Sequence, residues 1–157
     1  DYTSREFLEQ KEEIAFLKVY LELEKLRFGE DFSFEIVGSD TGIGQVPTLV
    51  IQPFAENALK HGLFHKKGPK HLHITFEGQD PLICTIEDNG IGREAAANIQ
   101  SRRHPTHHSF AMESIQKRMD LLSKKFDADF SVNIIDLTEN GSSTGTRIVL
   151  QFPKVTA

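Results

Sequence analysis

The chain has 157 residues, of which 38% are hydrophobic, so it has the size of a single domain and can bury one substantial core. Its net charge of -5 and charged fraction of 26% argue against disorder, and against a nucleic-acid partner because such a partner requires clustered Lys and Arg. No segment approaches the roughly 20 apolar residues of a membrane helix, and the single cysteine, Cys84, fits a reducing, cytosolic setting.

The first predicted element is a long N-terminal helix. Residues 4–28 contain no Gly or Pro and run into Gly29, a typical helix stop. At about 100° per residue the apolar side chains form two nearly opposite faces. One face holds Phe7, Ile14, Leu17, Leu21 and Phe28, and the other holds Phe16, Val19, Leu23 and Leu26. The helix is therefore either sandwiched inside its own domain or packed with its second face against a partner helix, as at a dimer seam.

Five strands and three further helices are predicted downstream. Alternating apolar residues predict strands at 32–37, 72–76, 82–87, 130–134 and 148–152. The helices are expected at 46–62, with Pro47 in the first turn, at 92–101, and from a Ser109 cap through Leu122. A polar loop at 102–108 is expected to be mobile. This order indicates an α+β fold, a two-layer α/β sandwich in which helices cover one face of a mixed sheet.

The most informative stretch is 51–62, which reads Ile-Gln-Pro-Phe-Ala-Glu-Asn-Ala-Leu-Lys-His-Gly. On a helical wheel Asn57, Lys60 and His61 lie within about 100° of one another, opposite the apolar side chains. An amide oxygen is a suitable ligand for Mg²⁺, and a lysine is a suitable point charge for phosphate oxygens. This face is therefore a candidate site for a metal-bound polyphosphate, although a solvated helix face is the ordinary alternative.

Two glycine-rich segments follow. The first, Asp88-Asn89-Gly90-Ile91-Gly92, comes directly after a predicted strand. Its glycines permit close approach of the backbone to a flat ligand, and its carboxylate can accept a hydrogen bond from an exocyclic amine such as that of adenine. An ordinary turn is the alternative. The second segment, 141–146, precedes the last predicted strand, and it lacks the Gly-Lys-Ser/Thr ending of a P-loop.

Taken in order, these motifs resemble the GHKL superfamily of ATPases and kinases, and within it the sensor histidine kinases of the LytS/YehU type. The stretch 51–62 is similar to the N box of that family, 88–92 to its G1 box, and 145–146 to its last glycine motif. The resemblance covers nearly the whole chain and implies the GHKL (Bergerat) fold. It also implies a division into residues 1–29, a helix linking to an upstream phosphoacceptor and dimerisation region, and residues 30–157, the ATP-binding catalytic domain.

The resemblance implies ATP and Mg²⁺ as cofactors. Asn57 would ligate Mg²⁺ and Lys60 would lie near the phosphates, and these two residues would carry catalysis, because phosphoryl transfer depends on positioning and charge neutralisation. Asp88 would bind the adenine amine, and Thr146 would lie close to the base or its bound water. The implied nucleotide-binding set is Glu56, Asn57, Lys60, His61, Asp88, Gly90, Ile91, Gly92, Ser109, Ala111, Met112, Gly145 and Thr146.

The partners that the resemblance implies lie outside the sequence. The acceptor histidine of this family stands in an upstream Asn-Pro-His-Phe-type motif, and none of the seven histidines here matches it. We therefore expect a fragment that binds nucleotide without phosphorylating itself. The full protein would be a membrane-anchored receptor with this domain in the cytoplasm, a response regulator of the LytTR type as its target, and a homodimeric state.

The sequence departs from the family at the lid. The usual Gly-x-Gly-Leu-x-Asn motif is replaced by residues 109–114, in which Ser109 and Ala111 stand in place of the two glycines. This change motivates an alternative, a non-catalytic or degenerate signalling module. ATP-hydrolysing relatives often carry a glutamate where Pro53 stands, so transfer to an acceptor is favoured over hydrolysis. Arg118 matches a family arginine, with an exposed ion pair as the ordinary alternative.

Overall fold

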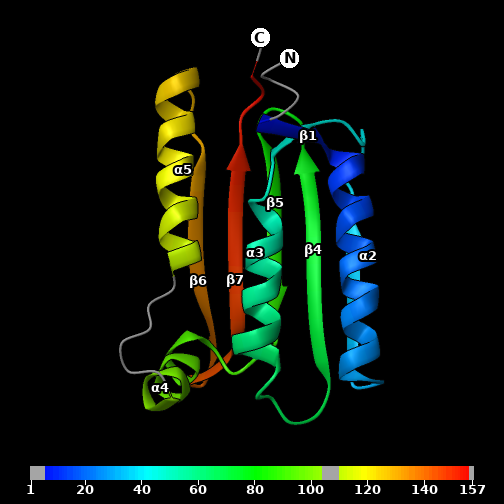
Figure 1. Cartoon of the computed structure of the whole chain (residues 1–157), viewed down its shortest axis with the longest axis vertical. Coiled ribbons are helices and arrows are strands. Elements are labelled where there is room, and N and C mark those ends of the chain that lie inside the picture. Colours follow the sequence, from blue (N-terminus) through cyan, green and yellow to red (C-terminus); the bar gives the residue numbers. More distant parts are fainter. Residues whose placement is uncertain (1–5, 104–109, 156–157) are drawn as a thin grey trace.

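A computed structural model describes residues 6–103 and 110–155, and these residues build a mixed sheet with helices on one face (Figure 1). The five strands, in their order across the sheet, are β2 (Phe32–Val37), β4 (Lys70–Gly78), β5 (Leu82–Asp88), β7 (Ser142–Phe152) and β6 (Ser131–Glu139). Strands β2 and β4 run parallel, and the other neighbours run antiparallel. All five strands predicted from apolar alternation are confirmed, and so is the mixed sheet.

The helical layer lies in front of the sheet in Figure 1 and closes the core between the two layers. It contains α2 (Gln10–Phe28), α3 (Ile51–Asn57) with the π-helix η1 (Ala58–Leu63) that continues it, and α5 (Phe110–Phe126). A further helix, α4 (Arg93–Arg103), lies across one end of the sheet. Fully buried side chains from both layers, such as Leu21, Phe54 and Ile74, meet in one core. The predicted two-layer sandwich is therefore confirmed.

The N-terminal helix begins at Gln10, so the prediction of a helix from residue 4 is wrong over Phe7–Glu9, while residues 4 and 5 lie outside the described residues. Phe7–Glu9 form a short strand, β1, that pairs antiparallel with β3 (Gln45–Pro47). Phe7 is buried, with its ring centroid 5.7 Å from that of Phe126 and 6.2 Å from that of Phe130. This aromatic packing favours the extended backbone over another helical turn.

The second helix begins at Ile51, so the prediction that it opens at Val46 with Pro47 in its first turn is also wrong. Pro47 ends β3 opposite Phe7, in a two-stranded ribbon that tolerates a residue without an N–H. Val46 and Pro47 are buried there, and Leu49, with a φ of 60°, turns the chain before α3 starts. The last strand also begins earlier than its apolar alternation predicts, because β7 starts at Ser142 and contains Gly145 and Thr146.

Helix α2 has one buried and one exposed apolar face. Leu17 and Leu21 are 1% and 0% exposed in the core. The opposite side chains remain accessible, namely Phe16 at 61%, Val19 at 63%, Leu23 at 58% and Leu26 at 82%. The alternative in which the helix is sandwiched inside its own domain is therefore wrong for the described residues. Among those residues no helix has the length and apolarity needed to cross a membrane.

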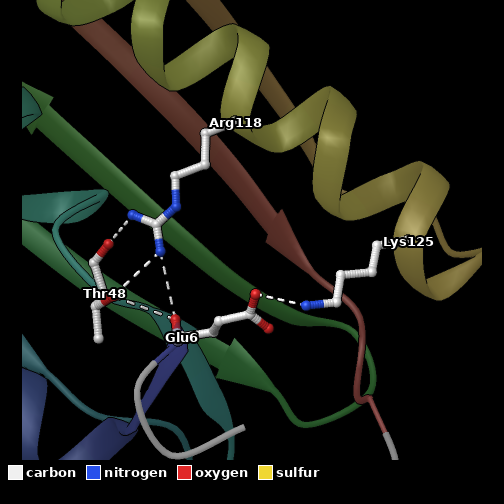
Figure 2. Close-up of polar contacts among 4 residues, drawn as sticks. All are labelled: Glu6, Thr48, Arg118 and Lys125. Carbon is white, nitrogen blue, oxygen red and sulfur yellow. Dashed lines mark hydrogen bonds and ion pairs between the residues drawn. The ribbon is translucent and has the colours of Figure 1, made fainter. Parts of the chain in front are cut away.

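Arg118 on α5 joins three distant segments, as Figure 2 shows. Its guanidinium donates to the carbonyl oxygen of Thr48, to the Thr48 hydroxyl at 3.1 Å and to the carbonyl oxygen of Glu6 at 3.4 Å. The exposed ion pair considered from the sequence is therefore wrong for Arg118, which is half-buried and binds mainly backbone. Lys125, about two turns further along the same side of α5, makes the ion pair instead, with its Nζ 2.7 Å from the Glu6 carboxylate (Figure 2).

Replacing Arg118 by Met is expected to destabilise the domain by about 1–3 kcal/mol, because the carbonyl groups of Thr48 and Glu6 lose a charged donor in a partly buried position. Lys125→Met is the matched control, and its exposed ion pair is expected to contribute less than about 1 kcal/mol. Urea unfolding followed by circular dichroism measures both changes. Equal losses in the two variants would contradict the structural role assigned to Arg118.

Candidate functional site

A pocket of about 300 Å³ opens between η1, α4 and the first turn of α5, above strands β6 and β7. Polar groups at its lining come from Asn57, His61, Asp88, Arg93 and Thr146. The remaining walls are mainly apolar and include Ala96, Met112, Ile134 and Ile148. A slot with apolar walls and a few converging polar groups is suited to a flat, partly polar ligand.

Asp88 supplies the buried carboxylate of this pocket. It is the last residue of β5 and is 6% exposed. Its Oδ1 accepts a hydrogen bond of 2.8 Å from the backbone N–H of Gly90. Burial raises the pKa of Asp88 from its ordinary value of 3.8 to about 6, although backbone hydrogen bonds from Gly90 and Thr146 oppose the rise. At neutral pH the group is therefore a carboxylate that can accept a hydrogen bond from a ligand.

Asn57 stands where α3 passes into the π-helix. The wider winding, seen in the hydrogen bond of 2.8 Å from the Phe64 N–H to the Leu59 carbonyl, changes the angles that an ordinary helical wheel assumes. Asn57 and His61 both line the pocket, whereas Lys60 is exposed and is not part of the lining. Two of the three polar side chains that the sequence grouped on this helix face therefore line the pocket, and the third does not.

The glycines of the site bring backbone segments into contact. The Ile91 N–H donates to the Gly62 carbonyl at 3.0 Å, and a Cβ on Gly90 would lie 2.4 Å from the Gly62 carbonyl carbon. Gly145 has a φ of +141°, and a Cβ there would lie 1.9 Å from the Asp88 carbonyl oxygen. Gly90 and Gly145 therefore hold the loop after β5 against its neighbours, while Gly92 lines the pocket itself.

Several members of the predicted set lie away from the pocket. Glu56 is close enough to Tyr20 of α2 to help raise the pKa of that phenol, after the larger effects of burial and Glu24. Ile91, Gly90 and Gly145 support the pocket without lining it. Met112, in contrast, lines the pocket from α5. Ser109 and the loop at 104–108 lie outside the described residues, as does the side chain of Ala111.

Sequence reasoning missed Arg93 and the strand residues Ile134 and Ile148. Arg93 is the first residue of α4 and lines the pocket directly after Gly92. Its Nε and Nη2 atoms each lie 2.8 Å from an oxygen of Asp136 on β6. The side chain of Arg93 lowers the pKa of Asp136. The position of Arg93 directly after Gly92 could have indicated that it lies at the site. Asp136 is 43 residues away in the sequence, and no motif there indicates that it pairs with Arg93.

Relatives of this chain are found in sequence and in structure. No family model matches the chain. In sequence it is 28% identical to the sensor histidine kinase BtsS of Escherichia coli over 151 residues, which are 94% of this chain and 24% of BtsS. It is 26% identical to the sensor histidine kinase YesM of Bacillus subtilis over 145 residues, which are 91% of this chain and 23% of YesM. The chain thus spans about a quarter of the length of these relatives.

Solved structures share the fold. The catalytic domain of histidine kinase ThkA superposes with a TM-score of 0.61 at 13% identity, covering 96% of this chain and 97% of that one. The mycobacterial sensor histidine kinase MprB gives a TM-score of 0.60 at 15% identity, covering 98% and 99%. The chain therefore has the fold of histidine kinase catalytic domains. In sequence the chain is similar to a part of the sensor histidine kinases BtsS, YesM and LytS.

Proposed function

We propose that this chain binds Mg²⁺-ATP and supplies the γ-phosphate to a histidine in another segment of its receptor. The observation that carries the proposal is the buried Asp88 carboxylate in a mainly apolar slot that Asn57 and His61 also line. A carboxylate that burial has stripped of water is well suited to accept a hydrogen bond from the amine of adenine, and the walls formed by Ile134 and Ile148 suit the ring.

Each residue has a defined role in this proposal. Asp88 and Thr146 bind the polar edge of the base, and Asn57 provides an amide oxygen to Mg²⁺. Such a single protein ligand fits the preference of Mg²⁺ for oxygen ligands, water and substrate phosphates. His61 and the exposed Lys60 face the outgoing phosphates. Bound Mg²⁺ supplies neutralisation of the phosphate charge, and the chain contributes positioning rather than a catalytic base.

The partners follow from the same proposal. The acceptor is the upstream histidine-bearing segment, the next recipient is a response regulator of the LytTR type, and the receptor is membrane-anchored with this domain in the cytoplasm. ThkA has been solved in complex with the response regulator TrrA, which supports a partner of this kind. Addition of the upstream segment with γ-labelled ATP tests transfer. Absence of label on that segment would favour the non-catalytic module motivated by Ser109 and Ala111.

The deciding experiment for the proposal is a calorimetric titration of the domain with ATP, with and without Mg²⁺. We expect binding that strengthens with Mg²⁺ and that loses this strengthening in Asn57→Ala, because the variant retains the base slot but not the metal ligand. No binding at millimolar ATP would overturn the proposal. Steady phosphate release by the isolated domain would instead indicate hydrolysis, the function that Pro53 disfavours.

The exposed face of α2 supports a homodimer, and we propose a second copy of this chain as its partner. Phe16, Val19, Leu23 and Leu26 follow the a and d positions of a heptad and are more than half exposed. In a parallel pair, Glu22 of one helix lies opposite Arg27 of the other, whereas an antiparallel pair brings the two Glu22 side chains together. Charge therefore favours parallel pairing of the α2 helices.

The double variant Leu23→Glu and Leu26→Glu is expected to abolish self-association, because it places charges in the middle of this apolar face. Sedimentation velocity over a range of concentrations measures the effect. Lys18→Glu, an exposed change on the same helix away from the apolar face, serves as the control and should associate like the unmodified chain. A monomer at every concentration in the unmodified chain would contradict pairing with a second copy.

A further inference from the structure

Arg93, which lines the pocket, forms an ion pair with Asp136, which does not line it. Arg93 begins α4 and Asp136 lies on β6, so the pair joins the helix to the sheet. Its geometry is bidentate, with both nitrogen-to-oxygen distances at 2.8 Å. The two side chains are 53% and 51% exposed. Solvent screens the two charges at this exposure, while the bidentate geometry holds the guanidinium in one orientation.

The sheet register places Asp136 next to the floor of the slot. Asp136 pairs with Thr146, and Ile134 pairs with Ile148, in the antiparallel ladder of β6 and β7. Residues directly opposite each other in such a ladder share a face, and so do residues two apart along a strand. Asp136 therefore lies on the same sheet face as the pocket residues Ile134, Thr146 and Ile148, one step towards the mouth.

A bidentate pair fixes the plane of a guanidinium, and a fixed plane is what an aromatic ring requires for stacking. Asp136 also compensates the charge of Arg93, which reduces its attraction for phosphate but leaves its flat face available. We propose that Arg93 is a base-positioning residue whose guanidinium, oriented by Asp136, stacks on the purine ring at the mouth of the slot. This inference rests on the proposed nucleotide-binding function.

The test compares ligands that share the base with one that lacks it. Calorimetric titrations with adenosine, Mg²⁺-ATP and tripolyphosphate are performed on the unmodified chain, on Arg93→Lys and on Asp136→Asn. Arg93→Lys retains the charge but loses the planar fork, and it is expected to weaken adenosine and ATP by the same factor, about fivefold to tenfold. Tripolyphosphate binding should not change in Arg93→Lys. Asp136→Asn is expected to weaken the binding of adenosine, because the guanidinium loses the carboxylate that orients it.

A matched control lies one residue away on the other face of the sheet. Arg147 and Glu87 form a second arginine–carboxylate pair, with Nε 2.6 Å from Oε1, on neighbouring strands next to Thr146 and Asp88. Arg147→Lys should leave all three titrations unchanged. Thermal melting of each variant shows whether the fold is retained, and we expect Arg93→Lys and Arg147→Lys to melt alike because both pairs are exposed.

The outcomes separate this inference from the function on which it rests. If the unmodified chain binds neither adenosine nor ATP, the proposed function and the inference both fail. If it binds them and Arg93→Lys binds them equally well, only the inference fails. A loss for ATP that exceeds the loss for adenosine would assign Arg93 to the phosphates and would also overturn base stacking.

Discussion

Asp88→Asn is expected to lose ATP binding by more than about a hundredfold while making the ligand-free domain more stable. The loss follows from the hydrogen bond that Gly90 already donates to Oδ1. If the amide oxygen of Asn keeps this bond, its NH₂ group takes the place of the second carboxylate oxygen and meets the adenine amine as donor against donor. A buried mismatch of this kind discriminates strongly.

The gain in the stability of Asp88→Asn comes from the burial of the Asp88 carboxylate, which the variant replaces with an uncharged amide. In the folded ligand-free domain the pKa of Asp88 is about 6, against an ordinary value of 3.8. The folded state therefore holds the proton more tightly than the unfolded chain, and the penalty for the charged form is complete above pH 6. A shift of this size corresponds to about 3 kcal/mol at most, so we expect Asp88→Asn to gain about 1–3 kcal/mol at pH 7.

The pH dependence provides the check. As pH falls from 6 towards 4, Asp88 becomes protonated in the folded domain, so the stability difference between Asp88→Asn and the unmodified chain should shrink towards zero. ATP affinity of the unmodified chain should fall over the same range, because the acceptor is lost. Urea unfolding at pH 7 and pH 4.5 measures the first effect, with Glu35→Gln, an exposed carboxyl on β2, as the control. A difference that is independent of pH would refute the assignment.

Gly145→Ala is expected to destabilise the domain by about 3 kcal/mol or more. The added Cβ would lie 1.9 Å from the Asp88 carbonyl oxygen, which is backbone in the middle of the sheet and cannot easily move aside. Gly141, in the same β6–β7 hairpin, is the matched control. It also has a positive φ, of +81°, but an added Cβ meets nothing within 4 Å.

Both glycine variants carry the cost of an unfavourable backbone conformation, about 1 kcal/mol, so the difference between them isolates the steric clash. Denaturant midpoints of the two variants measure this difference, and loss of folding in Gly145→Ala would be an extreme form of the expected result. Equal midpoints would show that the approach of β7 to Asp88 is not a constraint on the fold.

The parts of this fold that sequence predicted well are those with local periodicity. Alternation placed all five strands of the main sheet, because each presents one face to the core. Strands β1 and β3 were missed, since three residues carry no periodic signal and Phe7 is held by partners more than 100 residues away. The second helix was started too early because Pro47 fits a first helical turn as well as it fits an isolated ribbon.

The site shows the same division. The motif order identified Asp88 and Asn57, which line the pocket, yet the wheel for an ordinary helix also grouped Lys60 with them, and the π-helix changes that grouping. Glycine motifs do not reveal whether a glycine meets a ligand or another backbone, because both require the absence of a side chain. The contact of Gly145 with Asp88 follows from the register of β5 and β7, and the pairing of Arg93 with Asp136 from the packing of α4 beside β6, and neither is visible in the sequence.

The position of β1 gives the domain a mechanical property. The segment through which the chain enters is hydrogen-bonded to Thr48, three residues before α3 begins, and Arg118 of α5 holds both. Helix α3 leads to Asn57, and the first turn of α5 contributes Met112, so both helices border the pocket. The segment that leads into β1, the residues before α3 and helix α5 are thus joined to one another by direct hydrogen bonds. Tension applied ahead of Glu6 is borne by β1 in shear and reaches both walls of the pocket together.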